Sequence, residues 1–218
     1  LRPAEQLDLK HLVRTFTLRT SDGFVENFGP ALIARLSEEA PGVQLHFLQK
    51  LNQDSTLLRD GTVDLETGVV ADTTSPEVRT RALYQDRFIG VVRPGHPLSK
   101  DKITPARYAA GRHVLVSRRG RDQGPMDDAL DTLGLTREIV TIVGGFSAAL
   151  ALARASDLIA TVPERHTHTL RAGLHSFPLP VATPVITVSM LWHPRMDADA
   201  AHQWLRGCLR AVCAGSLD

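Results

Sequence analysis

Val185-Ile-Thr-Val-Ser-Met-Leu-Trp-His-Pro-Arg195, followed by Asp197-Ala-Asp-Ala-Ala-His-Gln-Trp-Leu-Arg206, lies near the end of the chain. The first part predicts an apolar strand that stops at its proline, and the second part predicts an amphipathic helix. Nothing in the stretch is arranged as a catalytic apparatus. This strand–helix pair closes a chain that we expect to be α/β throughout.

The first 70 residues alternate between strand and helix patterns. We expect strands at 13–20, 43–49 and 63–70, a helix from about Gly23 to Pro41, and a short helix capped by Asn52 or Asp54 and ending at Arg59. The long helix carries apolar residues four apart, namely Phe24, Phe28, Leu32 and Leu36, with Ile33 beside them. Ser21 and Asp22 both offer caps to it. A β-α-β-α-β order predicts a parallel sheet with helices packed on it.

A second lobe repeats this order. After an extended segment at 80–92 we expect strands at 113–117, 139–143, 158–162 and 184–192, helices at 105–110, 126–133, 145–155 and 198–214, and a helical turn within 164–171. We assign residues 1–12 to a linker, 13–86 and 192–215 to lobe one, and 87–191 to lobe two. Two lobes joined by hinge segments near 84–92 and 185–191 predict a clamshell. Its ligand would lie beyond the carboxyl ends of the strands, and the lobes would close around it.

The charge balance bears on DNA binding. A chain that binds DNA alone usually carries a basic stripe, whereas 25 basic and 24 acidic residues leave this chain a formal charge of +1. The one dense basic run is Ser117-Arg-Arg-Gly-Arg121. It fits either a solvated loop or a loop that contacts an anion at the mouth of a cleft.

Signals for catalysis, metal binding and membrane insertion are weak. None of the nine histidines has the spacing of a His-Glu-x-x-His motif, and Gly144-Gly-Phe-Ser-Ala148 lacks the second glycine of a nucleophile turn. Cys208 and Cys213 would point to different faces of one helix. No secretory signal or run of about 18 apolar residues is present. We therefore expect no enzyme activity, metal, cofactor or membrane partner, and a cytoplasmic location.

The order of several motifs resembles the effector-binding domain of LysR-type transcriptional regulators. The motifs are Thr20-Ser-Asp-Gly-Phe24, Pro41-Gly-Val43, Leu58-Arg-Asp-Gly-Thr-Val-Asp-Leu65, His96-Pro-Leu98, Ala155-Ser-Asp-Leu-Ile-Ala-Thr-Val-Pro163 and Leu191-Trp-His-Pro-Arg195. The last two are most similar to the branch of nodulation-type regulators, which answer aromatic plant signals. The sequence departs from the family pattern at Glu66, where many relatives have a small residue, and at Ser156 and Asp157, where they have glycines.

The resemblance implies a type 2 periplasmic-binding-protein fold, in which two Rossmann-like lobes are joined by two hinge strands. It also implies a small-molecule effector in the cleft between the lobes. The domain would form a homodimer or a higher homo-oligomer, with lobe one of one copy packed on lobe two of another. DNA would be bound only through an N-terminal winged helix-turn-helix domain that this sequence does not contain.

The candidate effector contacts follow the ends of the expected strands. They are Thr20, Ser21, Gln49, Asn52, Ala71, Ser117, Arg118, Gly144, Phe146, Val162 and Pro163. Each position also fits a structural role, as a helix cap, a polar loop or a helix entry. The resemblance favours Thr20 and Ser21 as contacts, whereas Asp22 would repel a carboxylate and is assigned to capping. The arginines at 118, 119 and 121 favour an organic acid, and Phe146 favours an aromatic ring.

Two other functions share parts of this pattern. The solute-binding protein of a transporter would have the same fold and a similar cleft, and a signal peptide or a lipid-attachment cysteine ahead of the domain would distinguish it. A hydrolase or another enzyme would need a nucleophile and a base at a suitable spacing, and no such pair is visible.

Overall fold

A computed structural model describes residues 7–71, 74–117 and 120–214 of the chain. The chain forms two compact units: unit 1 holds the residues up to Gln85 and from Thr187 onward, and unit 2 holds Asp86–Ile186. The chain thus changes unit at 85/86 and at 186/187. The lobe boundaries that we expect from the sequence lie at 86/87 and 191/192.

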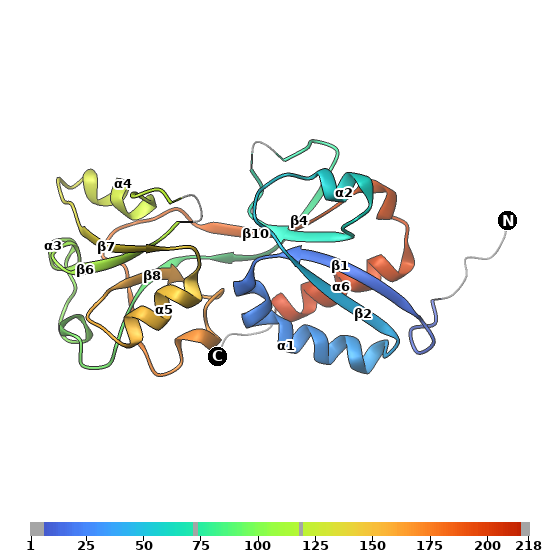
Figure 1. Cartoon of the computed structure of the whole chain (residues 1–218), viewed down its shortest axis with the longest axis horizontal. Coiled ribbons are helices and arrows are strands. Elements are labelled where there is room, and N and C mark those ends of the chain that lie inside the picture. The colour runs from blue at the N-terminus through green and yellow to red at the C-terminus, as the bar shows by residue number, and fades with distance from the viewer. Residues whose placement is uncertain (1–6, 72–73, 118–119, 215–218) are drawn as a thin grey trace. The chain divides into compact units, whose positions relative to one another are not determined.

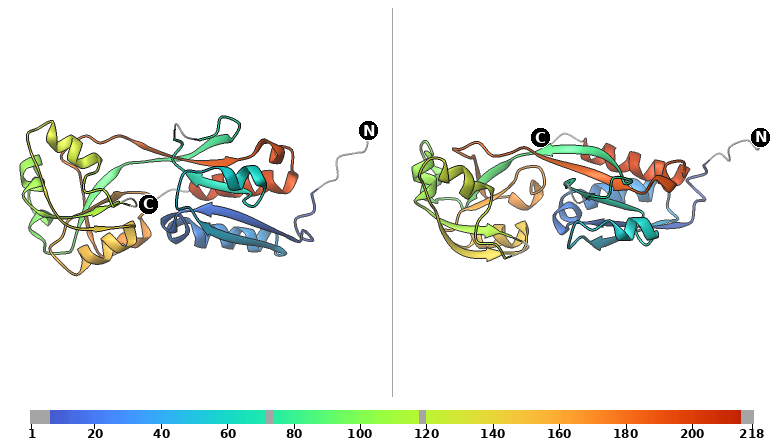
Figure 2. Two further views of the ribbon diagram at one scale, coloured as in Figure 1. Left: turned by 45° about the horizontal axis from the view of Figure 1, so that its top comes forward. Right: turned by 90° about the horizontal axis from the view of Figure 1, so that it is seen from above.

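Unit 1 is a five-stranded sheet with two long helices, α1 and α6, which contact each other (Figures 1 and 2). Its elements are β1 (Arg14–Thr20), α1 (Asp22–Glu39), β2 (Val43–Gln49), α2 (Thr56–Asp60), β3 (Leu65–Gly68), β4 (Arg79–Asp86), β10 (Ile186–Trp192), the 3-10 turn η3 (Pro194–Met196) and α6 (Ala200–Cys213). The strand order is β2-β1-β3-β10-β4. β1 runs parallel to β2 and β3, while β10 runs antiparallel to β3, so the sheet is mixed where the sequence pattern predicts a parallel one.

The apolar periodicity of α1 accounts for its packing. Phe24, Phe28, Leu32 and Leu36 are all buried, as their spacing of four predicts. Ile33 is 41% exposed and lies off this stripe. Ser21 is the N-cap, and its hydroxyl accepts a hydrogen bond from the Phe24 N–H. The assignment of Asp22 to the cap is therefore wrong, because Asp22 is the first residue of the helix.

The segment from Thr187 to Arg206 also packs in unit 1. The Trp192 indole N–H donates to Asp197 at 2.7 Å, and the Arg206 guanidinium lies 4.6 Å from the Trp192 ring centroid. Arg195 donates to the carbonyls of Leu58 and Arg59 at the end of α2. Basic side chains commonly satisfy the last carbonyls of a helix, so the Leu-Trp-His-Pro-Arg motif anchors α2.

Unit 2 contains two small sheets. Its elements are β5 (Phe88–Val92), the 3-10 turn η1 (Pro97–Ser99), α3 (Pro105–Ala109), β6 (Arg112–Val116), α4 (Pro125–Asp131), β7 (Glu138–Val143), α5 (Phe146–Arg154), β8 (Ala160–Pro163), the 3-10 turn η2 (Thr169–Arg171) and β9 (His175–Pro178). One sheet has the order β8-β5-β9, and the other pairs β6 with β7 in parallel. A parallel bridge between His113 and Ile159 connects the two sheets, so β6, β7 and β8 run in the same direction.

Two apolar clusters stabilise unit 2. One packs α5 against β5, β6 and β8 through residues such as Ile89, Val114 and Leu150. The other surrounds Tyr108 and Phe177.

Cys208 and Cys213 are buried in unit 1 and free, in agreement with their expected separation on the helix. Among the described residues, no helix is both long and apolar enough to cross a membrane.

Candidate functional site

Three strand ends meet at one edge of the sheet in unit 1. β1 is parallel to both β2 and β3, with Thr20 opposite Gln49 and Arg19 opposite Glu66. The carboxyl ends of these strands therefore lie along the same edge, where open α/β sheets bind ligands. The expected contacts Thr20, Ser21 and Gln49 all lie there.

Thr20 and Ser21 are already engaged in structural bonds. Thr20 is buried, and its hydroxyl hydrogen-bonds the Thr67 hydroxyl. The Ser21 hydroxyl caps α1. Gln49 is exposed and donates from its amide to Asp22 at 3.2 Å. Of these three residues, Gln49 has the side chain that is most accessible to a ligand.

Asn52 and Ala71 lie in loops that follow β2 and β3. Asn52 is exposed, and its side-chain oxygen accepts from Arg19 at 2.9 Å and from the Asp54 N–H at 2.9 Å. Neither Asn52 nor Asp54 is the N-cap of α2, because Ser55 occupies that position. The Ala71 N–H donates to the Thr74 hydroxyl at 3.1 Å, so this backbone donor is already engaged.

A buried cluster of charges lies under this edge, and sequence reasoning missed it. Glu66 accepts from Arg19 at 3.0 Å and pairs with Lys50 at 3.1 Å, and all three residues are at most 6% exposed. The charge expected in the sheet at Glu66 is thus compensated by two cations. Arg19 and Glu66 are opposite charges that face each other on adjacent parallel strands, but only the register of the two strands brings them together.

Unit 2 has a corresponding edge at the ends of β6, β7 and β8. Ser117 follows β6; its N–H donates to the Val143 carbonyl at 2.9 Å, and its hydroxyl accepts from the Arg121 N–H at 2.9 Å. Arg118 lies outside the described residues. Ser117 therefore joins the end of β6 to the end of β7, and its hydroxyl is engaged by the backbone of Arg121.

The Gly144-Gly145-Phe146 entry to α5 is the most open part of this edge. A Cβ atom at Gly144 or Gly145 would meet nothing within 4 Å, so this backbone is accessible to a ligand. Phe146 is half-buried against the core, and its ring meets His166 edge-on at a centroid distance of 6.0 Å. No sequence motif marks His166, which lies three residues after Pro163.

Val162 and Pro163 belong to the interior. Val162 is fully buried in the core cluster of α5, and Pro163 is also buried. The Pro163 carbonyl accepts from the Thr167 hydroxyl at 2.6 Å. These two residues are therefore part of the core beneath this edge, whereas Gly144, Gly145 and Phe146 are more exposed.

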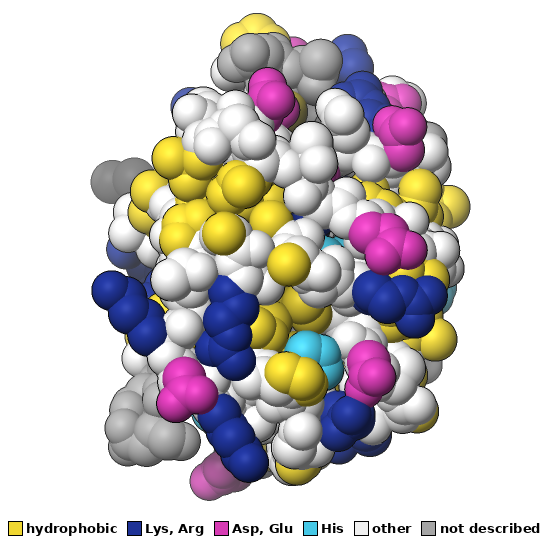
Figure 3. All heavy atoms as spheres, turned by 90° about the vertical axis from the view of Figure 1, so that its left-hand side faces the viewer, with side chains coloured by type: hydrophobic (Ala, Val, Ile, Leu, Met, Phe, Trp, Pro, Cys, Tyr) yellow, Lys and Arg dark blue, Asp and Glu magenta, His cyan; other side chains and the backbone are white. Residues whose placement is uncertain are grey.

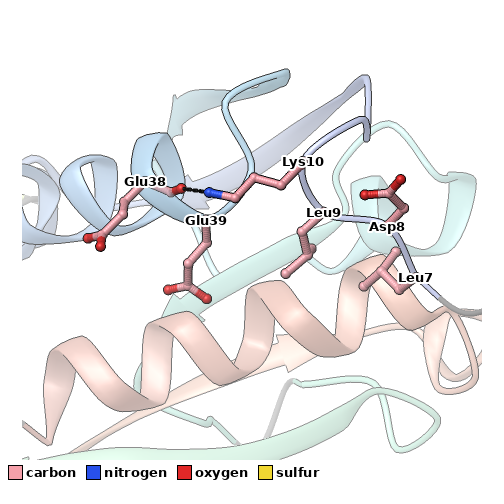
Figure 4. Close-up of a pocket in the computed structure, with 6 residues that line it drawn as sticks. All are labelled: Leu7, Asp8, Leu9, Lys10, Glu38 and Glu39. Carbon is pink, nitrogen blue, oxygen red and sulfur yellow. Dashed lines mark hydrogen bonds between the residues drawn. The ribbon is translucent and has the colours of Figure 1, made fainter.

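A hollow in unit 1 lies away from both edges. It has a volume of about 360 Å³ and is lined by Leu7, Asp8, Leu9, Lys10, Glu38 and Glu39 (Figure 4). Lys10 reaches the end of α1 and donates to the Glu38 carbonyl at 2.7 Å. The hollow adjoins the start of β1 and contains none of the candidate residues. Within the described residues, no group of three His, Cys, Asp or Glu side chains is placed to hold a metal.

Comparison with known proteins identifies the family. The LysR substrate binding domain matches residues 10–214. The chain belongs to the LysR substrate-binding domain family. This finding confirms the resemblance that the motif order indicated.

Similar LysR-type proteins include regulators of the expected branch. The chain is 31% identical over 213 residues to the HTH-type transcriptional activator NahR of Pseudomonas putida, a match that covers 94% of this chain and 69% of NahR. It is 30% identical to Nodulation protein D 3 of Rhizobium leguminosarum bv. phaseoli, covering 80% of this chain and 59% of that protein. The chain thus spans between about half and two thirds of the length of such relatives. These relatives favour a regulator over the solute-binding protein of a transporter.

A solved LysR-type structure has the same fold. The regulatory domain of MexT, a transcriptional activator in Pseudomonas aeruginosa, superimposes with a TM-score of 0.78 at 27% identity, covering 92% of this chain and 98% of that one. The α/β class and the periplasmic-binding-protein type of fold expected from the sequence are confirmed.

The face of the LysR domain shown in Figure 3 carries cationic and anionic side chains interspersed with apolar ones. No broad area of one charge covers this face. It therefore lacks the basic stripe that a DNA-binding surface requires.

Proposed function

We propose that this domain is the effector-sensing and oligomerising part of a LysR-type transcription regulator that acts in the cytoplasm. The observation that carries the proposal is the family match from residue 10 to residue 214. The edges at the carboxyl ends of the strands in the two units support it, since each combines polar residues or glycines with accessible side chains. The domain itself performs no catalysis in this proposal.

The proposed effector is an aromatic or organic acid. The open backbone at Gly144 and Gly145 and the half-buried ring of Phe146 support an aromatic group in unit 2. Gln49 and Asn52 support amide hydrogen bonds in unit 1. We propose that each unit by itself offers an edge of this kind to an effector. A ligand shifts the equilibrium of the regulator only through different affinities for its two states.

DNA binding is assigned to another domain of the whole regulator. NahR is by name an HTH-type activator, and we propose that a winged helix-turn-helix domain precedes this domain in the same way. The near-neutral charge of the 218 residues supports the assignment of DNA binding to another domain. The domain described here would transmit the effector signal through the geometry of a dimer.

Edge strands support self-association. β2 is the outer strand of its sheet in unit 1, and β7 is the outer strand of its sheet in unit 2. Val140 and Ile142 on β7 are each 39% exposed. An uncovered apolar edge strand is an aggregation hazard unless a partner covers it, so we propose that a second copy of the chain does so.

A thermal-shift screen against aromatic and aliphatic acids tests the sensing function. A ligand at a hundredfold excess over its dissociation constant stabilises the folded state by about 2.7 kcal/mol. Asn52→Ala tests the edge in unit 1 and Phe146→Ala tests the edge in unit 2, and a hit should lose its shift in the variant of the edge that binds it. Absence of a shift with every acid would contradict the proposal, and a loss with only one variant would confine the site to one edge.

A further inference from the structure

We propose that Arg19, held by Glu66, is a positioning residue for the loop 50–55, and that it fixes the Asn52 amide in the orientation that receives a ligand. The inference rests on the proposed function, because it assigns a role within the unit 1 edge of that site. Arg19 is only 4% exposed. It acts on the loop and does not contact the ligand itself.

The Arg19 guanidinium makes four hydrogen bonds, one to Glu66 and three to this loop. One terminal nitrogen donates to Glu66 Oε2 at 3.0 Å and to the Asp54 carbonyl at 2.8 Å. The other donates to the Asn52 carbonyl at 3.0 Å and to Asn52 Oδ1 at 2.9 Å. A planar guanidinium has its donors in a fixed fork, so one side chain sets the backbone position at two loop residues.

The same bonds fix the Asn52 side chain. Its oxygen accepts both from Arg19 and from the Asp54 N–H at 2.9 Å. With the oxygen held by these two donors, the amide NH2 group is the part of Asn52 that can donate to a ligand. The loop thus presents a donor at the edge where Thr20 and Gln49 end their strands.

Glu66 holds the Arg19 guanidinium in position. The carboxylate is 1% exposed and also pairs with Lys50 Nζ at 3.1 Å. A buried ion pair is weak evidence for stability, because desolvation of the charges offsets their attraction. Some buried pairs instead impose a particular conformation. The loop contacts of Arg19 indicate that this pair has such a role.

Arg14 provides a matched control on the same strand. It also pairs with a carboxylate, that of Asp199 at 2.8 Å. Its partner is the N-cap of α6, and within the described residues no hydrogen bond or ion pair joins Arg14 to loop 50–55. Arg14→Lys therefore perturbs a β1 ion pair without touching the loop.

The experiment compares hydrogen exchange and ligand binding in the full 218-residue chain. Amide exchange at Asp54 and the side-chain NH2 resonance of Asn52 are measured by NMR in the wild type, Arg19→Lys, Glu66→Gln and Arg14→Lys, and benzoate is titrated into each as the probe. A lysine keeps the charge but cannot form the fork. We expect about tenfold faster exchange at Asp54 and about tenfold weaker benzoate binding in the first two variants.

The results separate positioning from sensing. Unchanged exchange at Asp54 in folded Arg19→Lys would overturn the inference, as would faster exchange with benzoate binding at wild-type strength. An equal change in Arg14→Lys would also overturn it, because the effect would then be a general loss of stability. If wild type itself does not bind benzoate, the aromatic-acid proposal fails for this probe, and the exchange data alone decide the positioning role. If Arg19→Lys does not fold, Glu66→Gln decides the positioning role, because it leaves Arg19 and Asn52 in place and removes the charge that holds the guanidinium.

Discussion

At the scale of the residue, His113 is buried with an incomplete set of partners. Its Nε2 hydrogen-bonds the Tyr108 carbonyl at 2.8 Å, while Nδ1 is buried and has no partner among the described residues. Burial, followed by repulsion from Arg137, lowers the pKa of His113 from 6.5 to about 4. Protonation would place an N–H and a charge where nothing accepts them.

We predict that His113 makes unit 2 sensitive to mild acid. The pKa is lower in the folded state, so the unfolded state binds more protons between pH 6.5 and 4. Stability is complete above pH 6.5 and is lost as the pH falls towards 4. One pKa unit corresponds to about 1.4 kcal/mol, so the loss between pH 7 and pH 5 should be about 2 kcal/mol. Urea unfolding at both pH values measures it, with His113→Gln as the comparison. The His202 pKa is also lowered. The contribution of His113 is therefore the difference between the losses of stability measured in the wild type and in His113→Gln. A parallel loss in both would contradict the prediction.

At the scale of the element, the sequence predicted the bounds of a strand best where apolar and polar residues alternate regularly. β2 has the bounds that its alternation predicts, 43–49. β9 (His175–Pro178) was missed because prolines at 178 and 180 argue against a strand. The structure allows it because β9 is an edge strand of the order β8-β5-β9.

The candidate site was predictable only in part. Strand ends could be located from the sequence, but which side chains reach the surface there could not. Val162 fell at a strand end and proved to be core. Arg19 is a charged residue that is nevertheless buried, because its partner Glu66 comes from a strand 47 residues later. Local patterns carry no information on such long-range pairing.

The pairing of β5 with β9 depends on a glycine. Gly90 lies opposite Phe177, and a Cβ at Gly90 would overlap the Phe177 ring. We predict that Gly90→Ala destabilises the protein by about 2 kcal/mol or more, because overpacking a core displaces neighbours. Gly144→Ala is the control, since its Cβ would meet nothing within 4 Å. Thermal unfolding should show a lower Tm for Gly90→Ala alone, and Phe177→Leu in the same chain should restore part of it. Equal Tm values for the two alanine variants would refute this account of the strand pair.

At the scale of the whole molecule, the sensing and the association that we propose use different parts of each sheet. The effector contacts that we propose lie at the carboxyl ends of the strands, whereas the self-association that we propose uses the outer strands β2 and β7. A substitution on an outer strand should therefore alter assembly and leave the effector edges intact. The two properties can be measured separately in one protein.

We predict that Val140→Glu on β7 weakens self-association. A carboxylate at a residue that is 39% exposed costs little in the isolated chain, but within an interface it would be buried without a partner. Light scattering coupled to size-exclusion chromatography should show a dimer of the wild type and a shift of Val140→Glu towards the 23.8 kDa monomer. Leu133→Glu, a similar change at an exposed apolar residue of unit 2 outside any strand, should remain dimeric. A dimer in all three proteins would remove β7 from the interface, and a monomeric wild type at high concentration would exclude association through this domain.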